Sequence, residues 1–234
     1  MKKLSSRAIA AITNAVLALV LVVVGTVCFF PSVAGVSGLE GKAIYKGNSQ
    51  DGVSLMINVY WGTEEVYGML DVLDEYEAKA TFFIGGSWAD DNVSCLKEIR
   101  DRGHEIGSHG YFHLEHDKLT LAENAEEIRR SIEFLSLAAG VTVTLFAPPS
   151  GAYGDDTIAA ADGMGLKTVM WSKDTIDWRD KDEGLCYTRA TKEIGGGDLV
   201  LMHPMKHTLA ALPKILKYYR AHGLRAITVS ENLG

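Results

Sequence analysis

Apolar runs rich in β-branched residues alternate with segments of helical periodicity from residue 53 to the end of the chain. Such alternation is typical of parallel strands, each followed by a helix that covers the sheet. The runs predicted as strands are residues 53–59, 80–84, 105–108, 142–146, 167–171, 199–202 and 225–229. Because seven strands in about 180 residues are too few for a complete eightfold barrel, we expect an α/β fold with a distorted (β/α) barrel of about seven parallel strands. An open doubly wound sheet is the alternative, although no G-x-G-x-x-G follows the first strand.

One helix carries its own N-terminal signal. Thr120 followed by Glu123 has the spacing of a capping box, which predicts a helix over residues 121–138. Ile128, Ile132 and Leu135 fall on one face of this helix, so that face is expected to pack against the strands.

A long apolar run near the N-terminus follows the basic residues Lys2, Lys3 and Arg7. Basic residues on this side predict that the N-terminus stays in the cytoplasm while the rest is exported. Two interpretations remain open. A cleaved signal peptide fits the small residues at 32–34, and an uncleaved anchor fits a run long enough to cross about 30 Å of hydrocarbon. We therefore expect a signal peptide or transmembrane anchor (1–36), a linker (37–51) and one domain (52–234), at the extracytoplasmic face of the cell membrane or secreted.

The charge balance excludes one class of partner. Lys2, Lys3 and Arg7 are three of the 23 basic residues, so the part from Glu40 onward holds 20 basic residues against 30 acidic ones. This net negative charge argues against nucleic acid as a partner. Of the 3 cysteines, Cys28 lies in the apolar run, and whether Cys95 pairs with Cys186 stays open.

Unusual residues, most of them polar, gather at the ends of five predicted strands. They are Asn58, His109 and His113, Pro148 and Pro149, Asp174 and Asp177, and His203. In a βα barrel these strand ends meet on one face, where active sites are built. The alternative is that each is an ordinary loop residue, because loops are polar in any case.

Two histidines four residues apart, in S-H-G-Y-F-H, are the first candidate site. His109 and His113 can face the same way on a helical turn and hold a divalent ion such as Zn²⁺. Two imidazoles do not complete a zinc site, and a capping or packing pair is the alternative interpretation. A third imidazole, His116, is expected to face solvent.

The second candidate is His203, at the end of the run L-V-L-M-H. An imidazole at this place can give a proton to a leaving amine, and Asp177 is the natural carboxylate to fix its tautomer. Trp178 then serves as a wall that excludes water and stacks on a sugar. An ordinary loop with a packing tryptophan is the alternative.

These fragments, in this order, resemble the polysaccharide deacetylases, the NodB-homology or family 4 carbohydrate esterases. The family pattern T-F-D-D-G, H-[ST]-x-x-x-H, R-x-P-[YSA]-G, D-x-x-D-W and L-x-L-x-H corresponds here to residues 56–62, 108–113, 146–151, 174–178 and 199–203. The resemblance runs from about residue 53 to 229. W-G-x-E at 61–64 and the later A-L-P and T-V-S-E are similar to the branch common in spore-forming Gram-positive bacteria.

The resemblance implies removal of an acetyl group from an N-acetylated sugar by metal-assisted attack of water. It makes His109 and His113 ligands of a zinc-like divalent metal, and His203 the general acid with Asp177 behind it. Partners are then a cell-wall glycan or another N-acetylated polysaccharide, and the membrane through the N-terminal segment. The residues expected to contact the sugar are Trp61, Trp178 and Pro149.

Three positions depart from the family pattern at its chemical centre. Asn58 stands at the position of the general base and cannot accept a proton from water. Val59 stands where the family has the metal carboxylate, and Ala147 replaces the arginine that positions the base.

Two hypotheses follow from these departures. The first is a deacetylase of altered or low activity in which Glu64 or Glu65 takes over the base or metal role. The second is a catalytically silent glycan-binding protein at the cell envelope, in which Trp61 and Trp178 still hold a sugar chain.

Overall fold

The computed structural model describes residues 41–234. The predicted signal peptide or anchor (1–36) and the first part of the predicted linker lie outside the described residues. Within residues 41–234, none of the helices combines the length and apolar character needed to span a membrane.

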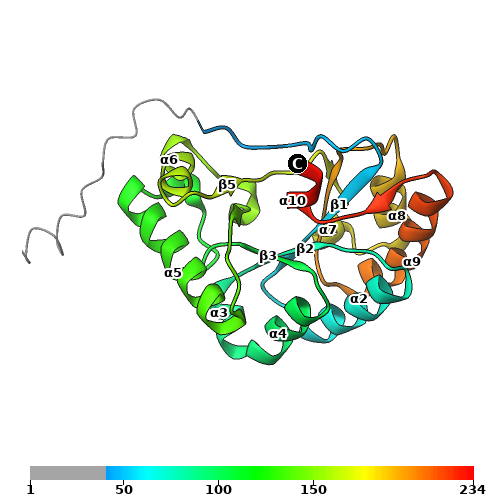
Figure 1. The fold of residues 1–234 in the computed structure, drawn as a ribbon, viewed down its shortest axis with the longest axis horizontal. Coiled ribbons are helices and arrows are strands. Elements are labelled where there is room, and N and C mark those ends of the chain that lie inside the picture. Colours follow the sequence, from blue (N-terminus) through cyan, green and yellow to red (C-terminus); the bar gives the residue numbers. More distant parts are fainter. Residues whose placement is uncertain (1–40) are drawn as a thin grey trace, which may run out of the picture. The chain divides into compact units, whose positions relative to one another are not determined.

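The core of the structure is a sheet of parallel strands that curves into part of a barrel (Figure 1). Its order is β5-β4-β3-β2-β1-β7-β6, and β8 pairs with the start of β1. The strands are β1 (Gly52–Val59), β2 (Thr81–Ile84), β3 (Glu105–Ser108), β4 (Leu145–Phe146), β5 (Lys167–Thr168), β6 (Lys173–Asp174), β7 (Leu199–Met202) and β8 (Arg225–Ala226). This partial barrel of parallel strands agrees with the predicted fold class.

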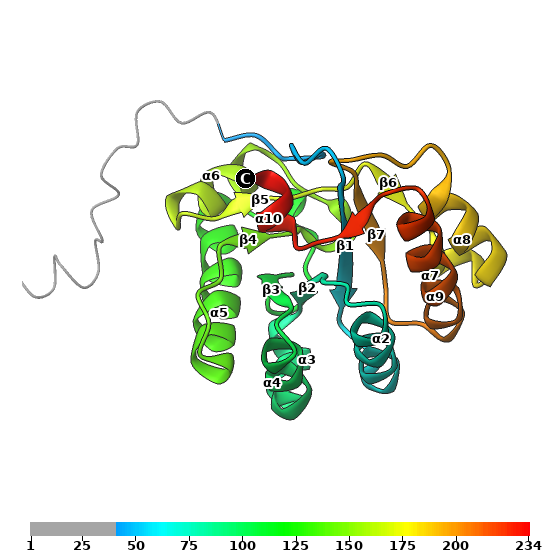
Figure 2. The ribbon, with the colours of Figure 1, turned by 45° about the vertical axis from the view of Figure 1, so that its right-hand side comes forward.

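Helices connect the strands, and most of them cover the outer side of the sheet. The last one, which carries Val229 and Leu233, packs instead with Met56 on the inner side. The helices are α2 (Thr63–Glu75), α3 (Gly86–Asp91), α4 (Val93–Asp101), α5 (Leu121–Ala139), α6 (Asp155–Gly163), α7 (Asp177–Asp180), α8 (Glu183–Thr191), α9 (Lys206–Ala221) and α10 (Val229–Leu233), with short 3-10 turns η1 (His116–Lys118) and η2 (Pro149–Gly151). Helices α5, α4, α2 and α9 follow one another around the strands (Figures 1 and 2). The predicted capping box of α5 is confirmed, because the Thr120 side chain accepts from the Glu123 N–H and Glu123 accepts from the Thr120 N–H.

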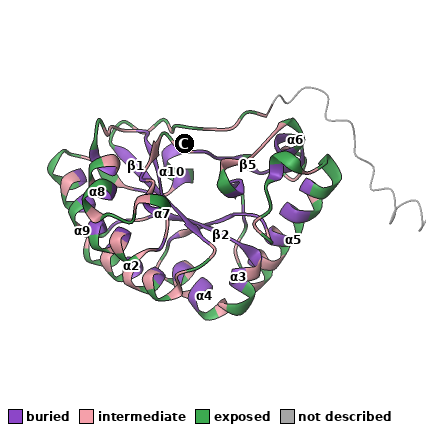
Figure 3. Ribbon diagram, turned by 180° about the vertical axis from the view of Figure 1, so that it is seen from behind, coloured by how far each residue is buried: buried purple, intermediate pink, exposed green. Residues whose placement is uncertain are grey.

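The strand pattern of β1 divides the core into two sides. Successive side chains of a strand point to opposite faces. Val53, Leu55, Ile57 and Val59 belong to the large apolar cluster under the helices, whereas Met56 belongs to a smaller cluster inside the barrel. Buried strands and outward-exposed helix faces are visible in Figure 3. Both faces of β1 are buried, although the inner face also carries the polar residues Ser54 and Asn58.

Three predicted strands are shorter in the structure, and one strand was not predicted. β4, β5 and β8 each keep only two residues, and the unpredicted β6 is Lys173–Asp174. β5 and β6 are the two ends of the strand order. A strand that pairs with a neighbour on one side alone is held by fewer hydrogen bonds, so it is shorter. The periodicity of the sequence does not show how many neighbours a strand has.

Residues 41–51 run against the folded domain. The Ile44 N–H donates to the Thr168 carbonyl, and Ile44 packs against the apolar cluster inside the barrel. Farther along, the Gly47 N–H donates to the Gly197 carbonyl. This segment therefore contacts both β5 and the residues that precede β7. The two ends of the described sheet, β5 and β6, do not pair with each other.

Candidate functional site

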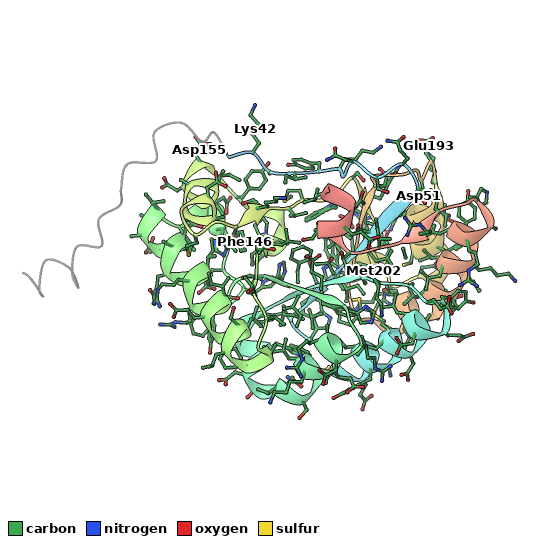
Figure 4. The ribbon with its side chains drawn as sticks, in the orientation of Figure 1. Lys42, Asp51, Phe146, Asp155, Glu193 and Met202 are labelled. Carbon is green, nitrogen blue, oxygen red and sulfur yellow. The ribbon has the colours of Figure 1, made fainter. Side chains whose placement is uncertain are left out.

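A cleft of about 340 Å³ lies at the carboxyl ends of the strands. Its lining residues are Asn58, Trp61, His109, His113, Ser150, Trp171, Asp174, Trp178, Leu201 and His203. Figure 4 labels Phe146 and Met202, the last residues of β4 and β7, from which the chain continues to Ser150 and His203. The parallel sheet thus brings together residues that are far apart in the chain, as the sequence predicted for His109, His113, His203 and Asn58.

Asn58 and Val59 point in opposite directions. Asn58, only 4% exposed, lines the cleft, and its Oδ1 is buried with no hydrogen-bond partner among the described residues. Val59 is fully buried in the large apolar cluster on the helix side. The position that the resemblance assigned to the metal carboxylate therefore faces away from the cleft, because β1 still alternates at Val59.

His109 is held rigidly beneath the cleft. Its Nδ1 lies 2.7 Å from the Ala147 carbonyl oxygen, which can only accept, so Nδ1 carries the proton and Nε2 of the neutral ring is an acceptor. Burial lowers the pKa of His109 to about 3, and the neighbouring His113 acts in the same direction. The buried imidazole is therefore neutral at physiological pH.

His113 stands at the end of a strained turn. Its φ of 58° is in the left-handed region, which is uncommon for a residue with a side chain. The ring lies edge-on to His109 with centroids 5.1 Å apart, and it packs against Tyr60 at 4.9 Å. Burial also lowers the pKa of His113. The two histidines are thus neighbours, as their spacing predicted.

The loop that carries these histidines is fixed from below by α5. The buried Glu127 carboxylate accepts from the N–H of Tyr111 at 3.0 Å and from the N–H of Phe112. His116 is fully buried and its Nδ1 bonds to Asn124 Oδ1 at 2.6 Å, so the expectation that it faces solvent is wrong. The sequence did carry a signal, because Asn124 and Glu127 share a helix face with Ile128.

The pair expected to act as general acid is assembled. His203 Nδ1 lies 2.7 Å from Asp177 Oδ1, while Asp177 Oδ2 accepts from the His203 N–H and from Thr208 Oγ1, each at 2.7 Å. Burial opposes ionisation of Asp177, but these bonds outweigh it and the pKa of the carboxyl is lowered. His203 therefore has a fixed orientation, with Nδ1 turned to the carboxylate.

Aromatic rings form the upper walls of the cleft. Trp61 is 40% exposed and Trp178 is 50% exposed, and Trp171 lines the cleft beside them. Pro149, expected to contact sugar, is buried and does not line the cleft, where Ser150 stands instead. The lining residues that the sequence did not point to are Ser150, Trp171 and Leu201.

The donor set of the cleft does not make a metal centre of the expected kind. Within residues 41–234, no group of three or more His, Cys, Asp or Glu side chains is arranged to hold a metal ion. Glu64 is exposed and Glu65 half-buried in the first turn of α2, and neither lines the cleft. Two neutral imidazoles without a charged ligand fall short of the three protein ligands usual at catalytic zinc.

Cys95 and Cys186 are separate, buried free thiols.

Comparison with known proteins gives matches over most of the chain. A family model described as polysaccharide deacetylase matches residues 46–169. The uncharacterized protein YlxY of Bacillus subtilis is 38% identical over 194 residues, covering 82% of this chain and 61% of that protein. A peptidoglycan-N-acetylglucosamine deacetylase of Bacillus cereus is 33% identical over 171 residues, covering 70% of this chain and 80% of that enzyme.

The chain is shorter than some of its relatives. The peptidoglycan-N-acetylglucosamine deacetylase PgdA of Listeria monocytogenes is 31% identical over 168 residues, which cover 71% of this chain but only 35% of that enzyme. The chain thus spans about a third of the length of PgdA and 61% of the length of YlxY.

Solved structures are also similar. BA3943 of Bacillus anthracis, described as a CE4 family pseudoenzyme, gives a TM-score of 0.81 at 33% identity and covers 84% of this chain and 70% of that chain. A mutant of BA3943 described as having restored enzymatic activity also gives 0.81, at 31% identity, covering 84% of this chain and 72% of that chain.

Proposed function

The chain belongs to the polysaccharide deacetylase family, and from that membership we propose that it binds an N-acetylated cell-wall glycan in the cleft without hydrolysing it. The observation that carries the proposal is the position of Asn58. Its amide occupies the cleft wall beside His109 and His113, where metal-assisted hydrolysis needs a group that takes a proton from water. An amide does not titrate in the range of such a base.

The groups that bind sugar are present while those that activate water are missing. Trp61 and Trp178 offer partly exposed rings, which pack well against the apolar faces of sugars. His203, held by Asp177, remains able to donate or accept a hydrogen bond at Nε2. Among residues 41–234 no carboxylate is grouped with the two imidazoles as a metal site requires, and the family's base position is Asn58.

The similarity to a protein described as a CE4 family pseudoenzyme supports this proposal. We also propose that the protein works at the cell envelope outside the cytoplasm, either anchored or released, because basic residues precede the apolar run near the N-terminus. Peptidoglycan is the proposed glycan, since relatives from Bacillus and Listeria are named as peptidoglycan deacetylases.

A deacetylase of low activity is the second candidate, and one observation favours it. The His203–Asp177 pair is complete, with Nδ1 and Oδ1 2.7 Å apart, as a general acid requires. Such an enzyme would need a different base. Glu64 and Glu65 lie outside the cleft lining, and Asp174 is the one carboxylate within it.

Two measurements on the purified protein separate the candidates. Calorimetric titration with N-acetylglucosamine hexamers is expected to show binding, and an assay for released acetate with the same oligomers, with and without added Zn²⁺, is expected to show none. Acetate release that rises with protein concentration would establish the second candidate. The proposal would be overturned if the protein bound neither the N-acetylglucosamine hexamers nor purified peptidoglycan.

A further inference from the structure

The lining of the cleft carries a negative charge. Asp174 is the one carboxylate among the lining residues, and no lysine or arginine is among them. At the position where the resemblance implies an arginine, the described structure has the buried Ala147.

One of the two carboxylate oxygens of Asp174 accepts no hydrogen bond from the described residues. Its Oδ1 accepts from the Ile176 N–H at 2.8 Å, and the described residues provide it no ion pair. Arg179 has a 56% exposed side chain and is paired with Asp180 at 2.7 Å. Asp180 is the main cause of the raised pKa of Arg179, and the charge of Asp174 adds to it, so Arg179 and Asp174 interact without forming an ion pair. Lys173 precedes Asp174 on β6, so its side chain is directed to the opposite face of the strand.

Asn58 in the cleft wall has an acceptor without a donor. Asn58 Oδ1 is buried with no partner among residues 41–234. His109 adds another acceptor, because its Nδ1 is committed to the Ala147 carbonyl and Nε2 keeps a lone pair.

From these acceptors we infer that the cleft prefers amino sugars whose acetyl group has already been removed, with Asp174 receiving the ammonium. This inference rests on the proposed glycan-binding function and names the sugar chemistry that the same cleft selects. An N-acetyl group offers one N–H donor, a carbonyl acceptor and no charge. An ammonium offers three donors, no acceptor and a positive charge, which matches a wall of acceptors with a free carboxylate.

In this arrangement the protein recognises the product of deacetylation rather than its substrate. Asp174 holds the ammonium of one sugar unit. Trp61 and Trp178 stack on sugar faces and do not distinguish acetylated from free amino sugars. The preference therefore resides in Asp174, and the general affinity resides in the rings.

The test compares glucosamine hexamers with N-acetylglucosamine hexamers by calorimetric titration of the purified protein. The free amino hexamer is expected to bind about tenfold more tightly at low salt, as a hydrogen-bonded charge pair provides. Added salt is expected to reduce this preference while leaving N-acetylated binding nearly unchanged, because only the charged ligand is screened. Asp174→Asn keeps the acceptor for the Ile176 N–H and removes the charge, so it is expected to abolish the preference.

Asp90→Asn is the matched control, because Asp90 is an exposed carboxylate of α3 outside the cleft lining. It is expected to keep the tenfold preference, and thermal unfolding of both variants checks that they fold. Equal or tighter binding of the N-acetylated hexamer overturns the inference and leaves the proposed function standing. A preference that survives in Asp174→Asn overturns the role of Asp174. Binding of neither hexamer overturns the proposed function itself.

Discussion

The indole of Trp61 lies parallel to the imidazole of His203, with ring centroids 5.7 Å apart and 7° between the planes. The contact arises from register, since β1 and β7 are neighbours and Ile57 pairs with Met202 at their carboxyl ends. Trp61 thus covers one face of an imidazole whose Nδ1 is already bound to Asp177. Only the Nε2 edge of His203 and the outer face of the indole remain to meet a ligand.

Trp61→Ala is expected to weaken binding of N-acetylglucosamine hexamers about tenfold, because a partly exposed tryptophan commonly dominates a binding surface. Calorimetric titration measures the change. Trp61→Phe is expected to retain part of the affinity, since a smaller ring still stacks. Leu137→Ala, at a residue that is 86% exposed and outside the cleft, is the control. Unchanged affinity in Trp61→Ala would remove this ring from the binding surface.

Asn58→Asp and Val59→Asp are expected to behave in opposite ways. At position 58 a carboxylate joins His109 and His113 at the cleft, so the affinity for Zn²⁺ is expected to rise about 10- to 100-fold. At position 59 a carboxylate enters the large apolar cluster, which is expected to lower the free energy of unfolding by about 3–5 kcal/mol. Competition with a chelating dye measures the first effect, and urea unfolding measures the second.

The exposed Asn48 supplies the control for metal binding, since Asn48→Asp adds the same charge away from the cleft. It is expected to leave the affinity for Zn²⁺ unchanged. A stable Val59→Asp variant with raised zinc affinity would contradict the direction in which the structure points residue 59.

Asp177→Asn is expected to lower the free energy of unfolding by about 2–3 kcal/mol, as loss of charged hydrogen bonds does. The carboxylate accepts bonds from His203, Trp178 and Thr208. An amide nitrogen in the place of one oxygen would face donors. Urea unfolding is the measurement, and Asp174→Asn, which replaces a half-buried carboxylate with one bond from the backbone, is expected to change stability by less than half as much. Equal effects would mean that the Asp177 network contributes little.

His104 gives the protein a dependence of stability on pH. Burial, assisted by the charge of Lys79, lowers the pKa of His104 to about 4 from its ordinary value of 6.5. Between these values the unfolded chain binds a proton that the folded protein does not, so stability falls as the pH drops below about 6.5. We expect His104 alone to account for about 1–2 kcal/mol of loss between pH 7.5 and pH 5.

His104→Asn isolates this contribution, because the new amide oxygen can still accept from the Ala80 N–H, as Nδ1 of His104 does. Urea unfolding of both proteins at pH 7.5 and pH 5 is the measurement, with the pH 7.5 pair as the control for packing. The variant is expected to lose less stability on acidification than the original protein. An identical loss in both proteins would show that His104 is protonated equally in the folded and unfolded states.

The sequence anticipated the local features of this fold well. The start and face of α5 follow from Thr120, Glu123 and the apolar spacing, and the predicted strands at 105–108 and 199–202 coincide with β3 and β7. These features depend on interactions within a few residues and on burial of whole strands, both of which leave a periodic pattern. The short strand β6 and the ends of β4 and β5 left none, because their extent depends on neighbours across the sheet.

The chain alone determined which chemical groups are available: two histidines four residues apart, an aspartate and a histidine suited to pair, and an asparagine in place of a base. Only the tertiary structure decided how they face. Strand alternation turns Val59 into the apolar core and Asn58 into the cleft, and helix α5 buries His116. The direction of a side chain is set by packing between distant segments, so the free carboxylate of Asp174 and the stack of Trp61 on His203 became visible only in three dimensions.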